Sequence, residues 1–405
     1  MIKPYKIAIV DQDGNPGGGA RFTNKIIENF SKEDRNLKID FFGNEDLIKK
    51  YIYKKNFNNI NFYYLKSLLL NKKGIFKIKQ SKKIVSILQK KLKKYSTVLP
   101  SYISGNLKKE MEKRLNNYDV VLFLWPYFLE CPNIKGRKII VLHDLNFKYY
   151  FSGQSTFNQS RINLLNETLK KWINVSDVIL TSNFMKKEFL KFYPKFKNNL
   201  KVIRMGSFAD SNNLKKLKKK NIFNFPYILC PSSTHGHKNI STLIKAFSII
   251  KKNNGKVRLI FSGPGTEVVN GNNSENFLEI CNKNNSIIGL GYIKNEEIDY
   301  LIKNALIVIN CSLYEPGNGS GLDAWKLGSL VAMSNISSFK EHINYLDVKA
   351  ELFDPINPRD MAKKINKLIS MDKFKRKKYI NYSKLKMKKV EWNLVIKEYI
   401  KFISY

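Results

Sequence analysis

Short, uninterrupted apolar runs alternate with amphipathic helical stretches along almost the whole chain, and this alternation constrains the fold most strongly. Typical runs are YKIAIVD (5–11), DVVLFLW (119–125) and RKIIVLHD (137–144). Strands that are apolar throughout, without a polar residue at every second position, are typical of sheets covered by helices on both faces. The pattern therefore predicts an α/β fold built on doubly wound parallel sheets.

A polar, lysine-rich stretch, NNLKKLKKKNIF (212–223), divides this alternation, which starts again with PYILCPS (226–232). A chain of 405 residues is also too long for a single ordinary hydrophobic core. We therefore expect two Rossmann-like domains that face a cleft. The predicted parts are an N-terminal domain over 1–211, a linker over 212–223, a C-terminal domain over 224–385 and a closing helix over 386–405.

Residues 49–118 interrupt the first domain with a segment that mixes lysines with apolar and aromatic side chains. One interpretation is a basic amphipathic surface that rests on anionic lipid or holds an acidic acceptor. The other is an ordinary helical insert whose lysines are solvated. The residues alone leave both interpretations open.

The chain has 72 Lys and Arg against 33 Asp and Glu, a formal net charge of +39, which indicates an anionic partner, a biased genome or both. Only nine of the cations are Arg, whereas proteins that read bases in a groove rely on the Arg fork. We therefore expect no specific nucleic-acid partner. Codon bias explains most of the charge, and a smaller share is available for an anionic membrane surface.

Three features bear on localisation. The longest apolar runs stay well below the roughly 18 residues of a membrane span, and the first residues, MIKPYKIAIVDQD, are typical of a strand and not of a signal peptide. The four cysteines, Cys131, Cys230, Cys281 and Cys311, lack metal-ligand or redox spacing. We expect a cytoplasmic protein, with peripheral attachment to the inner face of the cytoplasmic membrane as a further hypothesis.

A glycine-rich turn, DQDGNPGGGAR (11–21), follows the first strand. Neither the dinucleotide fingerprint nor the P-loop fits, because Phe22 stands where the third glycine belongs and Ala20 where the lysine belongs. The glycines either let the backbone approach an anion at the start of the next helix or form a tight strand–helix turn. The short D-x-D of Asp11 and Asp13 is too weak a pattern for a metal site, so no metal is predicted.

A second polar loop, CPSSTHGHKNISTLIKAF (230–247), connects a strand to an amphipathic helix. Its Lys238 stands at the helix start, where a lysine is unfavourable unless an anion is bound beside it. A diphosphate is the anion that a lysine point charge suits at such a position. The histidines His235 and His237 have no further ligands at metal spacing.

A third loop, YEPGNGSGLDAWKLGSLVAMSN (314–335), places Glu315 and Asp323 around three glycines, with a helix predicted to begin at Ser320. Ser320 and Asp323 fit a capping box, which alone would explain the second acid. The alternative is that exposed amides bind phosphate oxygens and both carboxylates accept sugar hydroxyls. This second interpretation also explains Glu315 and the glycines, whereas Asp323 remains open between the two.

Taken together, these segments resemble the retaining glycosyltransferases of the GT-B fold, family 4, which include bacterial mannosyl- and glucosyltransferases. EPGNGSGLD is similar to that family's E-x7-E motif, with Asp323 in place of the second Glu, and HKNISTLIKAF is similar to its K-N donor loop. The other matching segments are GGGAR, VLHDLNF, SDVILTSNFMKKEF, VIRMGSF, GLGYIKNEEIDYLI and EWNLVIKEYIKFI. The resemblance covers nearly the whole chain except 49–118, and it implies a C-terminal helix that returns to the N-terminal domain.

The resemblance implies an enzyme that moves a hexose from a GDP- or UDP-sugar to a hydroxyl of a glycan or glycolipid, with retention and without metal or cofactor. Its expected setting is cell-surface polysaccharide or lipopolysaccharide biosynthesis. A nucleotide-sugar epimerase or phosphorylase of the same fold, and a non-enzymatic basic nucleic-acid-binding protein, are the alternatives.

The family also implies roles for individual residues. Glu315, Lys238 and His143 are the expected catalytic residues, although His143 is equally well explained as a loop histidine with its bonds satisfied. The expected donor-binding residues are Gly18, Gly19, His237, Lys238, Asn239, Tyr292, Glu315, Ser320, Gly321, Leu322 and Asp323. The family usually has an Arg where this chain has Ser233, and His237 or Arg204 is the expected compensating phosphate partner.

Overall fold

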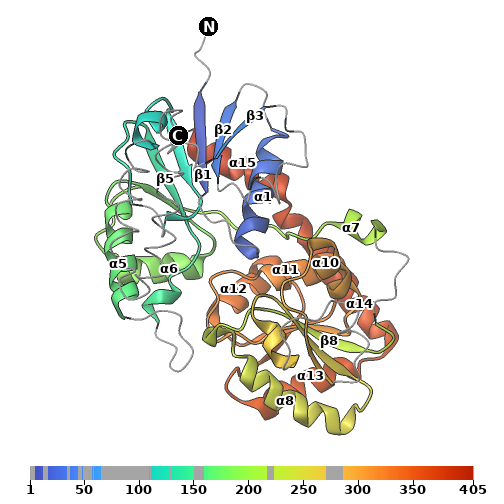
Figure 1. The fold of residues 1–405 in the computed structure, drawn as a ribbon. Helices are drawn as coiled ribbons and strands as arrows, with labels where there is room; N and C mark the ends of the chain where they lie inside the picture. Colours follow the sequence, from blue (N-terminus) through green and yellow to red (C-terminus); the bar gives the residue numbers. More distant parts are fainter. Residues whose placement is uncertain are drawn as a thin grey trace, which may run out of the picture.

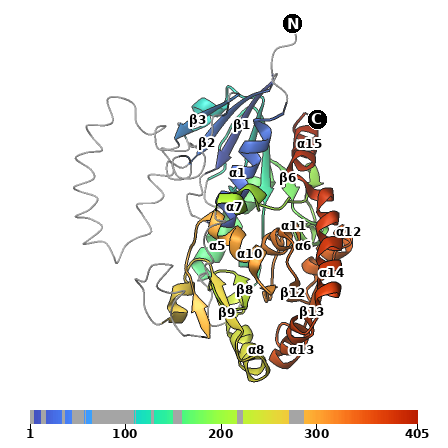
Figure 2. The same ribbon diagram turned by 90° about the vertical axis from the view of Figure 1, so that its right-hand side faces the viewer.

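The computed structural model describes residues 5–11, 17–33, 37–43, 48, 57, 59–64, 109, 111–126, 130–149, 159–216, 223–270 and 286–404. These residues form two parallel sheets, one of seven strands and one of six, and helices cover both faces of each sheet (Figures 1 and 2). The predicted α/β fold of two doubly wound parallel sheets is therefore confirmed.

The first sheet has the strand order β3-β2-β1-β4-β5-β6-β7. Its strands are β1 (Lys6–Asp11), β2 (Lys38–Gly43), β3 (Ile60–Tyr64), β4 (Val120–Phe123), β5 (Arg137–Leu142), β6 (Asp177–Leu180) and β7 (Leu200–Val202). Its helices are α1 (Gly18–Phe30), a 3₁₀ turn η4 (Asn146–Lys148), α5 (Gln159–Ile173) and α6 (Asn183–Phe192).

The second sheet has the order β10-β9-β8-β11-β12-β13. Its strands are β8 (Tyr227–Pro231), β9 (Arg258–Ser262), β10 (Ile287–Gly289), β11 (Ile307–Asn310), β12 (Val331–Ser334) and β13 (Glu351–Phe353). The helical segments are α7 (Ser211–Lys216), η5 (Gly236–Lys238), α8 (Ile240–Asn253), η6 (Thr266–Asn270), α10 (Asn295–Asn304), α11 (Gly319–Leu327), α12 (Ser337–Leu346), α13 (Pro358–Ile369), α14 (Lys373–Lys386), η7 (Met387–Val390) and α15 (Trp392–Ile403).

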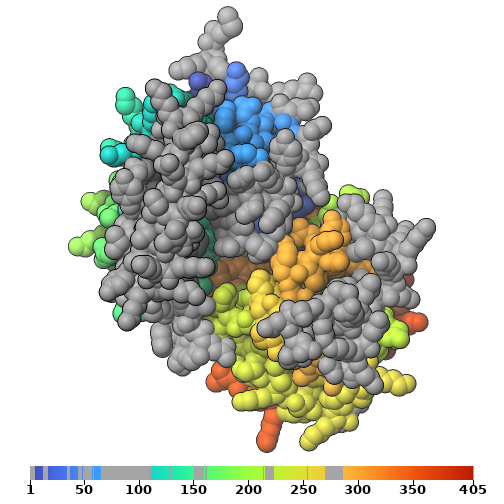
Figure 3. All heavy atoms as spheres, viewed as in Figure 1, coloured from blue at the N-terminus to red at the C-terminus, as the bar shows by residue number. Residues whose placement is uncertain are grey.

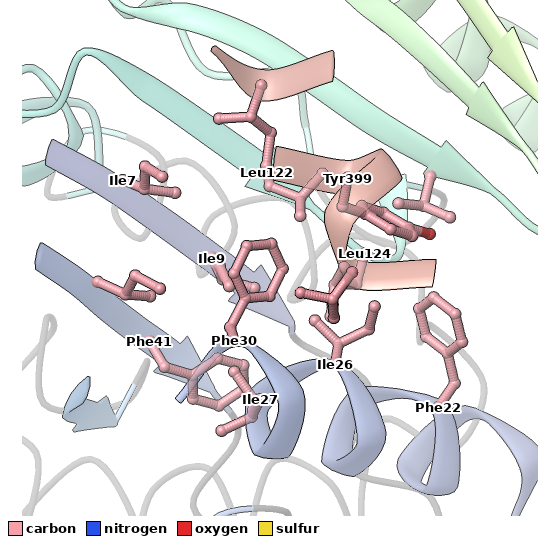
Figure 4. Close-up of a cluster of buried hydrophobic side chains, with 14 of the residues drawn as sticks. Ile7, Ile9, Phe22, Ile26, Ile27, Phe30, Phe41, Leu122, Leu124 and Tyr399 are labelled. Carbon is pink, nitrogen blue, oxygen red and sulfur yellow. The ribbon is translucent and has the colours of Figure 1, made fainter. Parts of the chain in front are cut away.

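Central strands such as β4 and β12 are buried at every position because helices cover both faces of each sheet, whereas the edge strands β3 and β7 are only partly buried. On one face of the first sheet, α1 directs Phe22, Ile26 and Phe30 onto the strands, and Tyr399 of α15 joins them (Figure 4). The helix α15 therefore returns from the second half of the chain to pack on the first sheet, next to α1. The helical segments that follow β1, β8 and β11 begin between the two sheets, at the carboxyl ends of these strands.

The structure corrects the extent of the predicted insert 49–118. Residues 60–64 form β3, which pairs in parallel with β2 at the sheet edge, and Met111 and Leu115 are buried in the first half's core. The strand was overlooked because INFYY is short and follows an asparagine-rich stretch. Residues 65–108 lie outside the described residues.

The predicted linker 212–223 begins in a helix, α7. This helix packs against α10 and places Leu214 on the second half's core. The domain limits themselves stay predictions. Among the helices that the structure describes, none combines the length and the apolar character needed to cross a membrane.

Candidate functional site

A cavity of about 390 Å³ lies between the two halves, at the carboxyl ends of the central strands. The first half contributes Gly17 from the turn after β1, and Gly18 and Arg21 from the start of α1. The second half contributes Lys238 from the loop after β8 and Glu315 from the loop after β11, together with Ser320 and Asp323 of α11. The three loops predicted from the sequence thus meet at one site.

The glycine turn of the first half places the start of α1 at this cavity. Gly17 is the N-cap, with φ of 140°, a conformation that favours glycine. A Cβ built on Gly18 would meet no heavy atom within 4 Å among the described residues, so the backbone there is open to a ligand. Gly19 lies in the first turn of α1 and is not among the residues that line the cavity.

Lys238 and Glu315 form an ion pair inside the cavity, which brings together the two strongest sequence candidates. Ser312 donates a hydrogen bond of 2.8 Å from its Oγ to Glu315 Oε1, so the carboxylate is fixed from two sides. The two loops are also joined by their backbones, because Leu313 N donates to His237 O at 2.7 Å. The arrangement offers one cation and one carboxylate at the wall of the cavity.

Asn239 has a structural role that the sequence did not show. Its φ of 57° is left-handed, and its Nδ2 donates to Cys311 O at 3.1 Å and to Pro355 O at 2.7 Å. Its Oδ1 accepts a bond of 2.7 Å from Thr242 Oγ1. The side chain therefore holds the lysine loop and does not line the cavity, and its contact with the sugar donor stays a prediction.

The start of α11 corrects the predicted capping box. The helix begins at Gly319 with Asn318 as N-cap, one residue earlier than predicted, so Ser320 cannot cap it. Leu322 N donates a hydrogen bond to Asn318 O at 2.9 Å. This amide is therefore not available for the phosphate contact that was predicted for it. The amides at the open end of the helix are those of Gly319, Ser320 and Gly321.

Asp323 is fully buried on α11, although it lines the cavity. Its Oδ1 accepts hydrogen bonds from Ser207 Oγ and Phe208 N, both at 2.7 Å, and from Ala209 N at 3.0 Å. Its Oδ2 lies 3.0 Å from Arg21 Nη1. The capping interpretation of Asp323 is wrong, and its contact with a ribose stays a prediction.

His143 is buried beside the first half's loops and is not among the residues that line the cavity. Its Nε2 lies 3.0 Å from Leu124 O, and its ring stacks on Trp125 with 3.9 Å between centroids. Burial lowers the pKa of His143 to about 3, against the opposing effect of the Leu124 carbonyl, so the ring is neutral. The geometry is that of a loop histidine with a satisfied Nε2, and contact with a sugar stays a prediction.

Asp144, the next residue, is a site candidate that the sequence analysis missed. Burial raises its pKa to about 6, against the lowering effect of a hydrogen bond from Asn146 N at 3.2 Å. The charges of Glu315 and Lys238 act on the same carboxyl in opposite directions. This acid of the first half is therefore within electrostatic range of the ion pair of the second half, although it is not among the residues that line the cavity. The sequence signal that could have identified Asp144 is its position directly after β5, at the carboxyl end of the strand.

Arg204, one of the two expected compensating phosphate partners, does not line the cavity. Its Nη1 lies 2.5 Å from Glu341 Oε1, and its guanidinium lies 4.1 Å from the centre of the Tyr345 ring. Glu341 also accepts bonds from Asn183 N and Phe184 N at the start of α6, so Arg204 belongs to a contact between the halves away from the cavity. Arg204 was expected as a partner because it lies in VIRMGSF, one of the segments that resemble the family, and a matching segment does not fix the direction of so long a side chain.

Two further predicted donor residues differ in their placement. Tyr292 lines the cavity and is 42% exposed, directly after Gly291 with φ of 62°. His237 does not line it, and burial lowers the pKa of His237 to about 4, with Lys238 adding to the shift. Within the described ranges, no group of three or more His, Cys, Asp or Glu side chains is arranged to hold a metal ion.

Comparison with known sequences finds a family model that is similar to the second half of the chain. Residues 190–386 match the family Glycosyl transferases group 1. An uncharacterized glycosyltransferase of Methanocaldococcus jannaschii is 26% identical over 166 residues, which cover 40% of this chain and 40% of that protein. The match therefore spans less than half of the curated relative's length.

Solved structures are similar over nearly the full chain. Anabaena HepE, in complex with UDP-glucose, has a TM-score of 0.66 at 15% identity and covers 98% of this chain and 99% of its own. WaaG, a glycosyltransferase involved in lipopolysaccharide biosynthesis, has a TM-score of 0.67 at 10% identity, with coverage of 98% and 99%. At these identities the likeness shows the fold, and the predicted GT-B fold is confirmed.

Proposed function

Because the chain carries a glycosyl transferases group 1 domain on a GT-B fold, we propose that it transfers a hexose from a nucleoside-diphosphate sugar to a hydroxyl of a glycan or glycolipid. The observation that carries the proposal is the cavity between the halves. There Lys238, Glu315 and the open end of α11 lie opposite the glycine turn of the first half. A cation and free amides suit a diphosphate, and a fixed carboxylate suits sugar hydroxyls.

The reaction proposed here breaks the bond between the sugar's anomeric carbon and the phosphate oxygen through an oxocarbenium-like state. Negative charge grows on the departing diphosphate, and Lys238 with the amides of Gly319 and Ser320 stabilises it. The acceptor oxygen attacks the same face, which gives retention, and its proton passes to the leaving phosphate. Glu315 contacts the transferred sugar on the reacting face, so no protein base and no metal ion are required by this scheme.

The nucleotide base is expected near the backbone at Tyr292, where the cavity also has apolar walls from Ile293 and Ile298. A thermal-shift panel of UDP- and GDP-sugars tests the proposal, because a ligand that binds only the folded state raises the melting temperature. We expect stabilisation by one of the two base classes, followed by transfer of its sugar to an alcohol acceptor. Stabilisation by neither class would contradict the proposal, and turnover without an alcohol acceptor would favour the epimerase or phosphorylase alternative.

Attachment to an anionic membrane surface, in the setting of cell-surface glycan synthesis, is the finer part of the proposal. The basic insert lies largely outside the described residues, but α14 provides another candidate surface. No Asp or Glu occurs between 373 and 390, and Phe374 and Leu385 are 80% and 60% exposed among its lysines. Basic residues interleaved with exposed apolar ones are typical of surfaces that lie on anionic lipid.

We therefore expect the full chain to bind vesicles containing phosphatidylglycerol and to be released at high salt, since screening weakens attraction between charges. Co-sedimentation measures the bound fraction. Replacing both Phe374 and Leu385 with alanine should lower it if α14 is the surface, whereas no change would assign the binding elsewhere. Equal binding to neutral vesicles would count against electrostatic attachment.

A further inference from the structure

Two buried carboxylates of the second half face the first half, and one of them, Asp323, lines the cavity. Asp299 on α10 and Asp323 on α11 are both 0% exposed. A buried carboxylate is costly unless it is paired and hydrogen-bonded. In the space-filling view, α10 (orange) reaches the junction between the halves (Figure 3).

Arg21 of α1, in the first half, pairs with both acids. Its Nη2 lies 3.3 Å from Asp299 Oδ1, and its Nη1 lies 3.0 Å from Asp323 Oδ2. The Arg21 side chain is 17% exposed and is one of the residues that line the cavity. One guanidinium fork thus connects the turn after β1 to two helices of the other half, at the wall of the proposed donor site.

The same two acids also hold the segment that connects the halves. Asp323 accepts the bonds from Ser207, Phe208 and Ala209, and Asp299 Oδ2 accepts one of 3.1 Å from Asp210 N. The Arg21 guanidinium lies 5.4 Å from the centre of the Phe208 ring. The bonds to Asp323 all fall on Oδ1, whereas Oδ2 has the ion pair with Arg21 and no hydrogen bond among the described residues. A ribose hydroxyl would therefore have to share Oδ2 with Arg21.

Arg21 is therefore a poor replacement for the arginine missing at Ser233. Its single positive charge already faces two carboxylates, so moving it onto a phosphate would leave both acids buried and less compensated. Its geometry suits a different task, which is to fix the glycine turn relative to the start of α11. Gly17 and Gly18 lie within one helical turn of Arg21, and Asp323 lies one turn after Gly319 and Ser320.

We propose that Arg21 is a positioning residue of the donor site, which acts through Asp299 and Asp323 to set the glycine turn against the amides of α11. This inference rests on the proposed function. It predicts that donor affinity depends on the first half of the chain even where no side chain of that half contacts the nucleotide. It also explains why this chain has Asp323 where the family has Glu. The shorter side chain keeps its carboxylate bound to the segment that connects the halves.

The chain offers a matched control. Arg204 and Glu341 form a second arginine–carboxylate pair between the halves, and Arg204 is 12% exposed, but neither residue lines the cavity. If Arg21 only holds the halves together, Arg21→Met and Arg204→Met should have similar effects on nucleotide binding. If it positions the donor site, only the first variant should weaken that binding.

The experiment uses the full chain and either UDP or GDP, whichever the wild type binds, with the dissociation constant measured by calorimetry and donor KM and kcat measured separately. We expect Arg21→Met to weaken nucleotide binding about tenfold, within the usual range of coupling between sites, and to raise donor KM more than it lowers kcat. Arg21→Lys should recover part of the loss. Arg204→Met should bind the nucleotide within about twofold of wild type.

Arg21→Met leaves two buried acids without this partner, so it is paired with the double variant Arg21→Met/Asp299→Asn, which removes one of the charges. Compared with Arg21→Met, the double variant should regain folding stability, but its affinity for the nucleotide should stay low. Wild-type affinity in either folded variant, or an equal loss in Arg204→Met, would overturn the inference. A wild type that binds neither UDP nor GDP would instead overturn the proposed function, and this inference with it.

Discussion

Replacing Lys238 with alanine is expected to lower kcat for sugar transfer by about two to three orders of magnitude, the usual cost of removing one group that stabilises developing negative charge. The Lys238 side chain is 21% exposed and is held by the anchored loop after β8, so its removal should not unfold the chain. Its ion pair with Glu315 is partly solvated, and such pairs contribute little to stability. Initial rates at saturating donor, together with a melting curve, measure both effects.

Lys245, exposed on α8 in the helix that follows the same loop, is the matched control for this change. Lys245→Ala removes the same charge and should keep wild-type turnover. A folded Lys238→Ala protein with near wild-type kcat would show that the lysine does not act on the leaving group.

Glu315→Gln should lower kcat by at least about a hundredfold while nucleotide affinity stays the same or improves. The glutamine keeps the size and can still accept from Ser312, but it removes the charge that faces the developing positive charge on the sugar. It also releases Lys238 from its ion pair, which leaves that cation free for the diphosphate. The two variants are thus distinguishable, because only Lys238→Ala should weaken nucleotide binding. Rates and calorimetry on the same preparations separate the two effects.

Glu351→Gln is the control for this second change. Glu351 is 8% exposed and pairs with Lys367 at 2.7 Å on β13, so the variant also removes a carboxylate bound to a lysine, but outside the residues that line the cavity. It should leave kcat unchanged. Near wild-type turnover in purified Glu315→Gln would refute the role of Glu315.

The features that could be predicted from the sequence are those that local patterns encode. Continuous apolar runs predicted the two parallel sheets, because a run of five or six apolar residues is by itself typical of a strand buried on both faces. Lys238 and Glu315 were found because each stands in a polar loop at a strand end, where sheets of this class place their ligands. Their ion pair follows from the adjacency of β8 and β11.

The features that were missed depend on contacts between distant segments. Arg21 gives no local signal, since Asp299 and Asp323 lie 278 residues or more along the chain from it. The capping box failed because Asn318, two residues earlier, takes the N-cap position. Asp144 was overlooked beside the more familiar His143, and only the folded structure shows which of the two the Glu315 and Lys238 charges reach.

The central claim is that a donor's two phosphates bind between the lysine of η5 and the open start of α11. A crystal structure of the full chain with UDP or GDP tests it most directly. We predict phosphate oxygens within hydrogen-bond distance of Lys238 Nζ and of the Gly319 or Ser320 amide, with the glycine turn of the first half facing them. A nucleotide bound outside the cavity, with the Lys238–Glu315 pair undisturbed, would contradict the account.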